Sequence, residues 1–406
     1  MTAEVARRRL PYPYRGMLAI CSDLDETADL QTYLETARFL NTTAITRYGS
    51  GLGLEVGNTI YFDMPPGQFS YWNTDEQGRN SVRALIRSGH VDCLHSFGDL
   101  ADTRAHAGRA LDDLDRHGCS LRVWIDHAVA PSNFGADIMR GRGDVPGARE
   151  YHADLSCAFG IRYVWRGRVT SVIGQGVPRR LGGIANAAHP AASARTWAKE
   201  AAKGLLARRG DPKYRLHALN PVLTPATLRS GHAVSEFLRA NPHWGGVSRG
   251  ETARGIGEVL TEDMLTRLVA REGSCILYTH LGKTATATSP FRPDGIAALR
   301  RLAEYQNDGR VLVTTTNRVL GYTHAVEQIR LSTSVSGDVL LLDVEVPGGR
   351  EQLADLQGLT FYVPDPSRTR LRLNGCEVVR LQHNPADDTG RRSVTVPWRR
   401  LEFPEC

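Results

Sequence analysis

The chain has 406 residues, of which 41% are hydrophobic and 23% are charged. This balance is that of an ordinary globular protein and excludes a disordered or fibrous chain, and the length predicts two domains. The formal net charge of +6 comes from basic residues scattered along the chain, without the clustered basic and aromatic stripe of a nucleic-acid surface. No apolar run reaches the length of a membrane span, and none follows the basic N-terminus, so we expect a cytoplasmic protein with neither a nucleic-acid nor a membrane partner.

The seven cysteines are widely spaced and include no C-x-x-C pair. This pattern predicts neither a disulfide framework nor a zinc site made of cysteines. Any metal site would therefore have to use histidine and carboxylate side chains.

Apolar runs of strand length alternate with segments of helical periodicity over the first three quarters of the chain. The expected strands cover residues 16–21, 91–94, 121–125, 161–165, 274–278 and 311–314. The expected helices cover residues 30–40, 81–88, 103–117, 152–159, 262–271 and 294–307, and loops are expected at 167–183, 182–192 and 283–290. Such alternation indicates an α/β fold with a parallel sheet, and the number of units favours a (β/α)-barrel-like, deformed-barrel domain over residues 1–325.

The pattern changes after residue 325. Short, partly alternating segments separated by turn residues cover 329–335, 338–346, 359–363 and 370–373. They predict a small antiparallel, sandwich-like all-β domain over residues 326–406.

Chemically useful side chains directly follow several of the expected strands. Asp23 and Asp25 come after the first strand, and His95 and Asp99 come after the second. The carboxyl ends of parallel strands meet at one edge of a sheet, so these side chains should lie close together. Neutral histidine combined with carboxylate is a ligand set suited to zinc or a similar divalent ion. The alternative roles are a helix N-cap for the acidic pair and a hydrogen-bonded loop residue for His95.

Later strand ends carry the same residue types. The further candidates that follow an expected strand or open the next helix are His127, Asn133, His152, Asp154, His280 and Arg318. Each alone is more often structural, as a capping acid, a bonded histidine or an arginine on a carboxylate. Several such strand ends in one sheet together favour a shared site.

The first two strand ends and the one near residue 280 resemble the motifs of the polysaccharide deacetylase (NodB-homology) superfamily. Members are deformed (β/α) barrels that remove N-acetyl groups with a divalent metal. The family's opening acidic pair corresponds to Asp23 and Asp25, here separated by one residue. Its His-Ser/Thr-x-x-His motif corresponds to residues 95–99, with Asp99 in place of the second histidine, and its final strand ending in histidine corresponds to residues 276–280. The family's Arg-x-Pro-Tyr motif has no clear counterpart.

The resemblance implies a metal-dependent hydrolase that deacetylates an N-acylated sugar or a related carbohydrate. It implies a divalent ion, zinc or alternatively magnesium, held by Asp25, His95 and Asp99. Asp23 would then be the catalytic base, His280 would protonate the leaving amine, and His127 would orient substrate or water.

Four strand-end residues are left as candidates for substrate binding. They are Asn133, His152, Asp154 and Arg318. The spacing of the acidic pair leaves open which of the two acids is base and which is ligand. The oligomeric state is not predicted by any pattern in the sequence.

Two other functions remain open at this stage. Residues 23–27 also resemble the Asp-x-Asp-x-Thr opening of haloacid dehalogenase phosphatases, in which Asp23 would be the nucleophile, Asp25 the acid/base, Lys283 the required lysine and Mg²⁺ the cofactor. The other alternative is a non-catalytic carbohydrate-binding protein, since a fold does not by itself fix a function.

Overall fold

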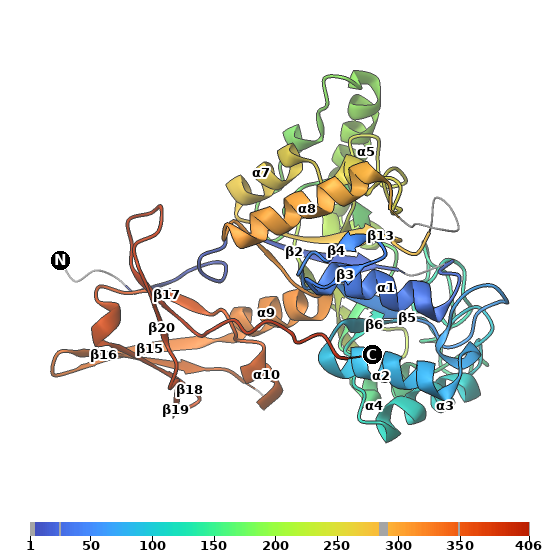
Figure 1. Ribbon diagram of the computed structural model, residues 1–406, viewed down its shortest axis with the longest axis horizontal. Helices are drawn as coiled ribbons and strands as arrows, with labels where there is room; N and C mark the ends of the chain where they lie inside the picture. Colours follow the sequence, from blue (N-terminus) through green and yellow to red (C-terminus); the bar gives the residue numbers. More distant parts are fainter. Residues whose placement is uncertain (1–4, 24–25, 284–290, 348–349, 406) are drawn as a thin grey trace.

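The structure is a computed structural model that describes residues 5–23, 26–283, 291–347 and 350–405. The described chain is mixed α/β, and its largest element is an eleven-stranded sheet that curls into a half-barrel with helices around it (Figure 1). Asp25 and most of the expected loop at 283–290 lie outside the described residues. None of the described helices is both long enough and apolar enough to pass through a membrane.

The curled sheet is mostly parallel, as predicted. Along it the strands follow the order β10 (Leu223–Thr227), β11 (Ala233–Phe237), β8 (Tyr163–Trp165), β7 (Val123–Ile125), β6 (Val91–His95), β5 (Gly57–Ile60), β2 (Gly16–Ser22), β13 (Ser274–Thr279), β12 (Arg239–Ala240) and β9 (Val169–Thr170). The eleventh strand, β14 (Val311–Val313), pairs with the first half of β2. Only β10 and β11 pair antiparallel within this sheet.

Helices cover the outer face of the sheet. They are α1 (Leu30–Asn41), α2 (Glu76–Ser88), α3 (Arg104–Arg116), α4 (Ala153–Phe159), α5 (Pro190–Arg208), α6 (Ile256–Val259), α7 (Glu262–Arg271) and α8 (Pro293–Asn307). In Figure 1, α7 and α8 lie above the strands and α2, α3 and α4 lie below them. One apolar cluster joins side chains of α2, α3 and α8 to alternate residues of the strands, such as Leu18 and Val164.

The other face of the strands points into the curl. Met17, Ala19 and Cys21 of β2 belong to a second apolar cluster, together with Val123 and Ile125 of β7. Because side chains alternate between the two faces of a strand, these residues and their i+2 neighbours line the interior. This alternation decides which strand-end residues can meet.

Helix α9 (Thr316–Gln328) belongs to the interior cluster as well. Val319, Leu320 and Tyr322 are buried in it, together with Met17 of β2. The helix therefore closes the end of the half-barrel at which the strands begin. The opposite end, where the strands finish, is left for polar side chains.

The C-terminal residues, joined by the N-terminal strand β1, form two four-stranded sheets that share the interior cluster. One has the order β1 (Ala6–Arg7), β17 (Thr360–Tyr362), β21 (Ser393–Thr395) and β20 (Gln382–Asn384), and the other has the order β15 (Arg330–Ser336), β16 (Val339–Glu345), β18 (Thr369–Leu373) and β19 (Cys376–Glu377). The expected antiparallel pairing holds for most of these strands, but β16 and β18 are parallel. Between them the chain makes the short helix α10 (Arg350–Ala354) and crosses to the other sheet. A small hairpin, β3 (Ile45–Thr46) with β4 (Gly49–Ser50), completes the strands.

Sequence periodicity missed several elements. Helix α5 begins within the expected loop at 182–192, and β5, β10 and β11 fall in segments for which no element was predicted. The segment that forms α5 is rich in alanine, so it lacks the apolar stripe by which an amphipathic helix is recognised. β5 contains Gly57 and Asn58, which have low strand propensity, and is fixed by its two neighbours in the sheet.

A buried ion pair ties the half-barrel to the C-terminal sheets. Arg122, just before β7, donates two hydrogen bonds of 2.7 and 2.8 Å to the carboxylate of Asp355 and one of 2.9 Å to Asn317 on α9. We predict that Asp355→Ala lowers the free energy of unfolding by about 3 kcal/mol, because it leaves a largely buried guanidinium without its counter-ion. Urea denaturation measures this change.

The matched control is Asp343→Ala. Asp343 lies 3.9 Å from Arg372 in a partly exposed pair, which is worth about 0.5 kcal/mol or less. Equal destabilisation by the two substitutions would contradict the structural role of the Arg122 pair.

Candidate active site

The polar ends of several strands meet inside the half-barrel. Asp23 continues the inward series of Met17, Ala19 and Cys21, and His95 is the next inward residue after Cys93 on β6. His280 likewise follows Tyr278 at the end of β13. Asp23, His95 and His280 are all buried, with exposed fractions of 2%, 2% and 6%. The strand-end convergence expected from the sequence is therefore observed for these three residues.

Asp23 is bound by a fully buried arginine that the sequence analysis did not identify. Arg239, on the short strand β12, donates from both terminal nitrogens to the two carboxylate oxygens of Asp23, with an Nη1–Oδ1 distance of 3.1 Å. Its guanidinium carbon lies 4.1 Å from the ring centre of Trp165 and 4.4 Å from that of Tyr278, so the cation also rests on two aromatic rings. A charged residue inside the short apolar run 237–240 was the signal that could have revealed it.

The charge of Asp23 is set by this arrangement. Burial alone would raise the pKa of the carboxyl group, but Arg239 and then His95 and His280 outweigh burial and hold the pKa well below its usual range. The same ion pair raises the pKa of Arg239 against the effect of its own burial. Asp23 is therefore a carboxylate at neutral pH.

Both histidines turn the same ring nitrogen towards this carboxylate. Nδ1 of His95 lies 3.2 Å from the carbonyl oxygen of Ile125, and Nδ1 of His280 lies 2.9 Å from that of Glu251. A carbonyl oxygen only accepts, so Nδ1 carries the proton in both rings and Nε2 is the basic nitrogen. The Nε2 atoms lie 3.5 and 3.9 Å from the same oxygen, Oδ2 of Asp23. The two imidazole rings thus converge on the oxygen of Asp23 that also accepts from Nη2 of Arg239.

A second acid–histidine pair lies at the rim of this cluster. Nδ1 of His127 is 3.2 Å from Oδ1 of Asp99, whose side chain is 41% exposed. The ring of Tyr61 joins the two parts, because it stacks on His95 at 4.6 Å and meets His127 edge-on at 5.1 Å. The structure thus places Asp99 beside His127. Tyr61 is a further residue that the sequence analysis missed.

The loops that carry these side chains have unusual backbones. Three of the six non-glycine residues with positive φ in the described chain are Glu26, Ser96 and Ala128, in the loops that follow β2, β6 and β7. Such conformations cost roughly 1–3 kcal/mol each and cluster at functional sites. Gly98 has a φ of +100°, and a Cβ atom there would lie 2.0 Å from the carbonyl oxygen of Asp63. The loop after His95 is therefore held in a form that only glycine permits.

Alternation also explains why His127 reaches the site and its neighbour Asp126 does not. Asp126 follows Trp124 on the outward face, where its carboxylate accepts hydrogen bonds from the Trp124 indole at 2.7 Å and from the backbone N–H groups of Phe134 and Gly135 at 2.8 Å. Burial raises the pKa of Asp126 to about 7 in spite of these three donors. Asp126 holds the loop after β7 in place.

Three predicted substrate-binding residues hold the same loop region. Asn133 binds the backbone of His127 through both ends of its amide. His152 is fully buried, with one ring nitrogen on the carbonyl of Ser132 and the other on the hydroxyl of Ser156, and burial lowers its pKa to about 4. Asp154 forms a two-pronged pair with Arg104, with both distances at 2.7 Å. Among the described residues, none of these three side chains contacts Asp23, His95 or His280.

The fourth predicted substrate-binding residue, Arg318, lies near the other end of the sheet. It pairs with Glu55, which precedes β5, and donates to the carbonyl of Arg399. The reason is the register of β14, whose last residue Val313 pairs with Leu18 in the middle of β2. The residues after β14 therefore do not reach the level of Asp23.

The described residues contain no group of three or more histidine, cysteine or acidic side chains arranged to hold a metal ion. Of the three expected ligands, Asp25 lies outside those residues and Asp99 is beside His127. His95 does have the character of a ligand. Its Nδ1–H is fixed by a backbone carbonyl, as it is in most metal-bound histidines, so that Nε2 is oriented for coordination.

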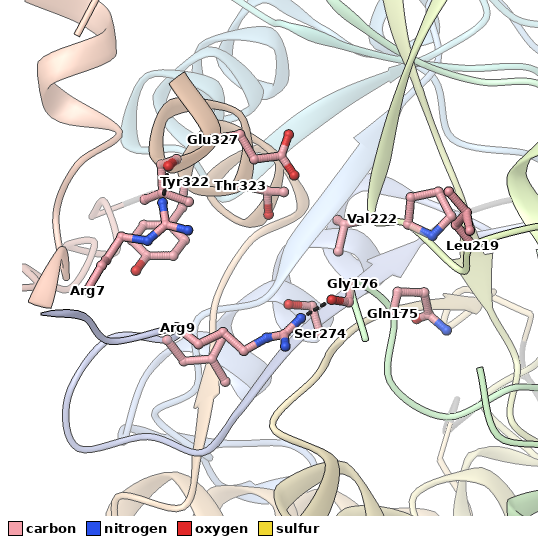
Figure 2. Close-up of a pocket in the computed structure, with 13 residues that line it drawn as sticks. Arg7, Arg9, Gln175, Gly176, Leu219, Val222, Ser274, Tyr322, Thr323 and Glu327 are labelled. Atoms are coloured by element: carbon pink, nitrogen blue, oxygen red, sulfur yellow. Dashed lines mark hydrogen bonds between the residues drawn. The ribbon is translucent and has the colours of Figure 1, made fainter. Parts of the chain in front are cut away.

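A separate pocket of about 290 Å³ lies at the closed end of the half-barrel (Figure 2). Figure 2 shows Arg7 and Arg9 of the N-terminal segment opposite Thr323 and Glu327 of α9. Arg7 donates to the carbonyl of Val326 and Arg9 to that of Gly176. The polar groups of this pocket thus serve to join segments of the chain.

Comparisons of this chain with family models, with curated proteins and with solved structures give no match. The case for a function therefore depends on the geometry of the strand-end cluster.

We predict that Arg239→Met lowers the free energy of unfolding by about 3–5 kcal/mol, because it leaves the buried carboxylate of Asp23 without its cation. The double variant Arg239→Met/Asp23→Asn should regain part of this loss, because a neutral amide needs no counter-ion. Urea denaturation of the two single variants and the double variant gives the coupling energy. If the losses in free energy of unfolding of the two single variants simply added in the double variant, the result would contradict the pairing of Arg239 with Asp23.

Asp126→Asn tests the raised pKa of Asp126. Because the folded pKa of about 7 lies above the unfolded value of about 4, the contribution of the neutral carboxyl is fully present below pH 4 and is lost as the pH rises through 7. The variant lacks this contribution, so its deficit in stability relative to the wild type should shrink between pH 4 and pH 7, by at most about 1.4 kcal/mol per pH unit, and level off above pH 7. A deficit independent of pH would mean that the three N–H donors keep Asp126 ionised.

Proposed function

We propose that the protein is a metal-dependent hydrolase of amide bonds that deacetylates an N-acylated sugar or a related carbohydrate. The observation that carries this proposal is the pair of basic nitrogens, on His95 and His280, that face one oxygen of an ionised and buried Asp23. A carboxylate fixed between a cation and two histidines is equipped to move protons at a reacting centre. The proposal also places this chemistry at the carboxyl ends of the strands, as in other barrel enzymes.

In this proposal each side chain has a separate task. Asp23 accepts a proton from the attacking water, and Arg239 keeps the carboxylate ionised and oriented by holding both of its oxygens. His280, in its protonated form, delivers a proton from Nε2 to the leaving amine, while Nδ1 stays bonded to the Glu251 carbonyl. His127, paired with Asp99 at the exposed rim, orients the substrate or the water.

A divalent ion, zinc or alternatively magnesium, would be held by His95 with Asp25 and Asp99. When bound, such an ion supplies Lewis-acid polarisation of the amide carbonyl. The oriented Nε2 of His95 supports this assignment. Asp99 would have to turn from His127 to the ion, and its exposed side chain has room to do so.

The rest of the proposal concerns the setting of the site. Residues 1–325 would form a deformed (β/α) barrel of the polysaccharide deacetylase kind, and residues 326–406 a sandwich-like β-domain beside it. We propose a cytoplasmic enzyme that acts on a small-molecule or carbohydrate substrate. Asn133, His152 and Asp154 would contribute to substrate binding only indirectly, by shaping the loop that carries His127.

The geometry supports the phosphatase alternative less well. That mechanism needs Asp23 as a nucleophile and has no role for the two histidines whose Nε2 atoms face it. Lys283, its required lysine, lies 3.5 Å from the exposed carboxylate of Glu26. A non-catalytic binding protein would have little need of a buried, charged cluster.

The test combines metal content with activity. We predict that protein purified without chelators contains a transition metal, that His95→Ala loses most of it, and that the wild type releases acetate from N-acetylated amino sugars or their oligomers. Asp23→Asn should lower kcat/KM by roughly 10²- to 10⁴-fold, because the base is removed while an acceptor for Arg239 remains. Elemental analysis and an acetate assay measure these outcomes.

Two matched controls accompany these variants. His106→Ala on α3 and Asp343→Asn on β16 remove the same groups away from the cluster, and both should retain metal and activity. Circular dichroism establishes that every variant is folded. Metal-free protein whose Mg²⁺-dependent phosphatase activity disappears in Asp23→Asn would replace the proposal with the phosphatase alternative.

A further inference from the structure

Strand β15 forms an open edge of the C-terminal sheet. Its seven residues pair only with β16 among the described residues, and β16 separates β15 from the rest of its sheet. All seven side chains are exposed, including Leu331 at 37% and Val335 at 71%. Figure 1 shows β15 and β16 reaching away from the half-barrel.

The turn between the two strands fixes which backbone groups of β15 face outward. Gly337 and Asp338 form a two-residue turn between the paired residues Ser336 and Val339, with a positive φ at Gly337. The residues that flank such a turn bond to each other, and bonded and non-bonded pairs then alternate along the hairpin. Ser336 and every second residue before it therefore bond to β16. The N–H and C=O groups of Leu331, Thr333 and Val335 point to the open side.

This open side is complementary to a second copy of itself. If two β15 strands pair antiparallel about a two-fold axis through Thr333, each Leu331 lies opposite the Val335 of the other copy, and all three outward residues gain both of their backbone hydrogen bonds. The axis is perpendicular to the sheet, so the apolar side chains of both copies stay on one face. On that face Leu331 and Val335 also flank Leu342 of β16, which is buried.

Charge favours the same arrangement. Arg330 is the only charged residue of β15, and the two-fold register puts it opposite Ser336 and diagonal to the exposed Asp338 of the other copy. No pair of like charges meets across the strands. The strand also lacks the proline, lysine or inward charge with which proteins protect an open edge.

We propose that β15 is a homodimer interface, in which two copies of the chain join their C-terminal sheets into one continuous eight-stranded sheet across a two-fold axis. The interface is independent of the strand-end cluster and of the proposed hydrolase activity.

The proposal is tested with Thr333→Pro in the full-length chain. Proline removes the outward N–H at the two-fold axis without removing a hydrogen bond between β15 and β16, because Thr333 does not bond to β16. Sedimentation velocity over a range of concentrations should show the wild type as a dimer of the 44.7 kDa chain and the variant as a monomer, with at least a tenfold increase in the dissociation constant.

Thr333→Val is the matched control, since it keeps both the N–H group and the β-branched shape, and it should remain dimeric. Leu331→Lys is a second variant that leaves the backbone unchanged, and like charges near the interface should weaken the dimer. At low protein concentration, a melting temperature equal to that of the wild type shows that a monomeric variant keeps its fold. A wild type that is monomeric at every concentration, or a dimer that survives both substitutions, would overturn the proposal.

Discussion

The arrangement of the half-barrel depends on one buried ion pair, between Asp23 and Arg239. Each partner alone would be costly to bury, since an isolated charge loses its hydration without compensation. Together they satisfy each other, and the rings of Trp165 and Tyr278 cover the guanidinium. The pair also joins β2 to β12, two strands that are not neighbours because β13 lies between them. It therefore fixes the curvature of the sheet at the end where the site lies.

The same pair gives the two histidines their character. Because Asp23 stays ionised, the basic nitrogens of His95 and His280 face a permanent negative charge rather than a neutral partner. Their other nitrogens are already committed to backbone carbonyls, so rotating the rings would break existing hydrogen bonds. The two rings are thus fixed with both Nε2 atoms turned to one oxygen of Asp23.

The sequence predicted the parallel α/β sheet and placed Asp23, His95, His127 and His280 together, because apolar strands followed by polar residues are a local pattern. The charged residue in the apolar run 237–240 was its only signal of Arg239, and no pattern linked Arg239 to Asp23, which lies 216 positions away in the chain. The sequence could not exclude Arg318 from the site either, because the offset register of β14 is set by tertiary pairing. Asp126 is the clearest example of what the sequence did not resolve. The alternation of β7 places the Asp126 side chain on the outer face of the sheet, whereas the side chain of the next residue, His127, points inward.

The two ends of the half-barrel differ in how their polar groups are satisfied. At the end closed by α9, the two arginines that line the pocket donate to the backbone carbonyls of Val326 and Gly176. At the other end, a buried ion pair and two histidines gather at Asp23, and the backbone is strained at Ser96, next to His95, and at Ala128, next to His127. Strain and buried charge both cost free energy, and a fold retains them together where they serve binding or chemistry. The end at which the strands finish is therefore distinguished by its buried charges, whatever the size of the cavities at either end.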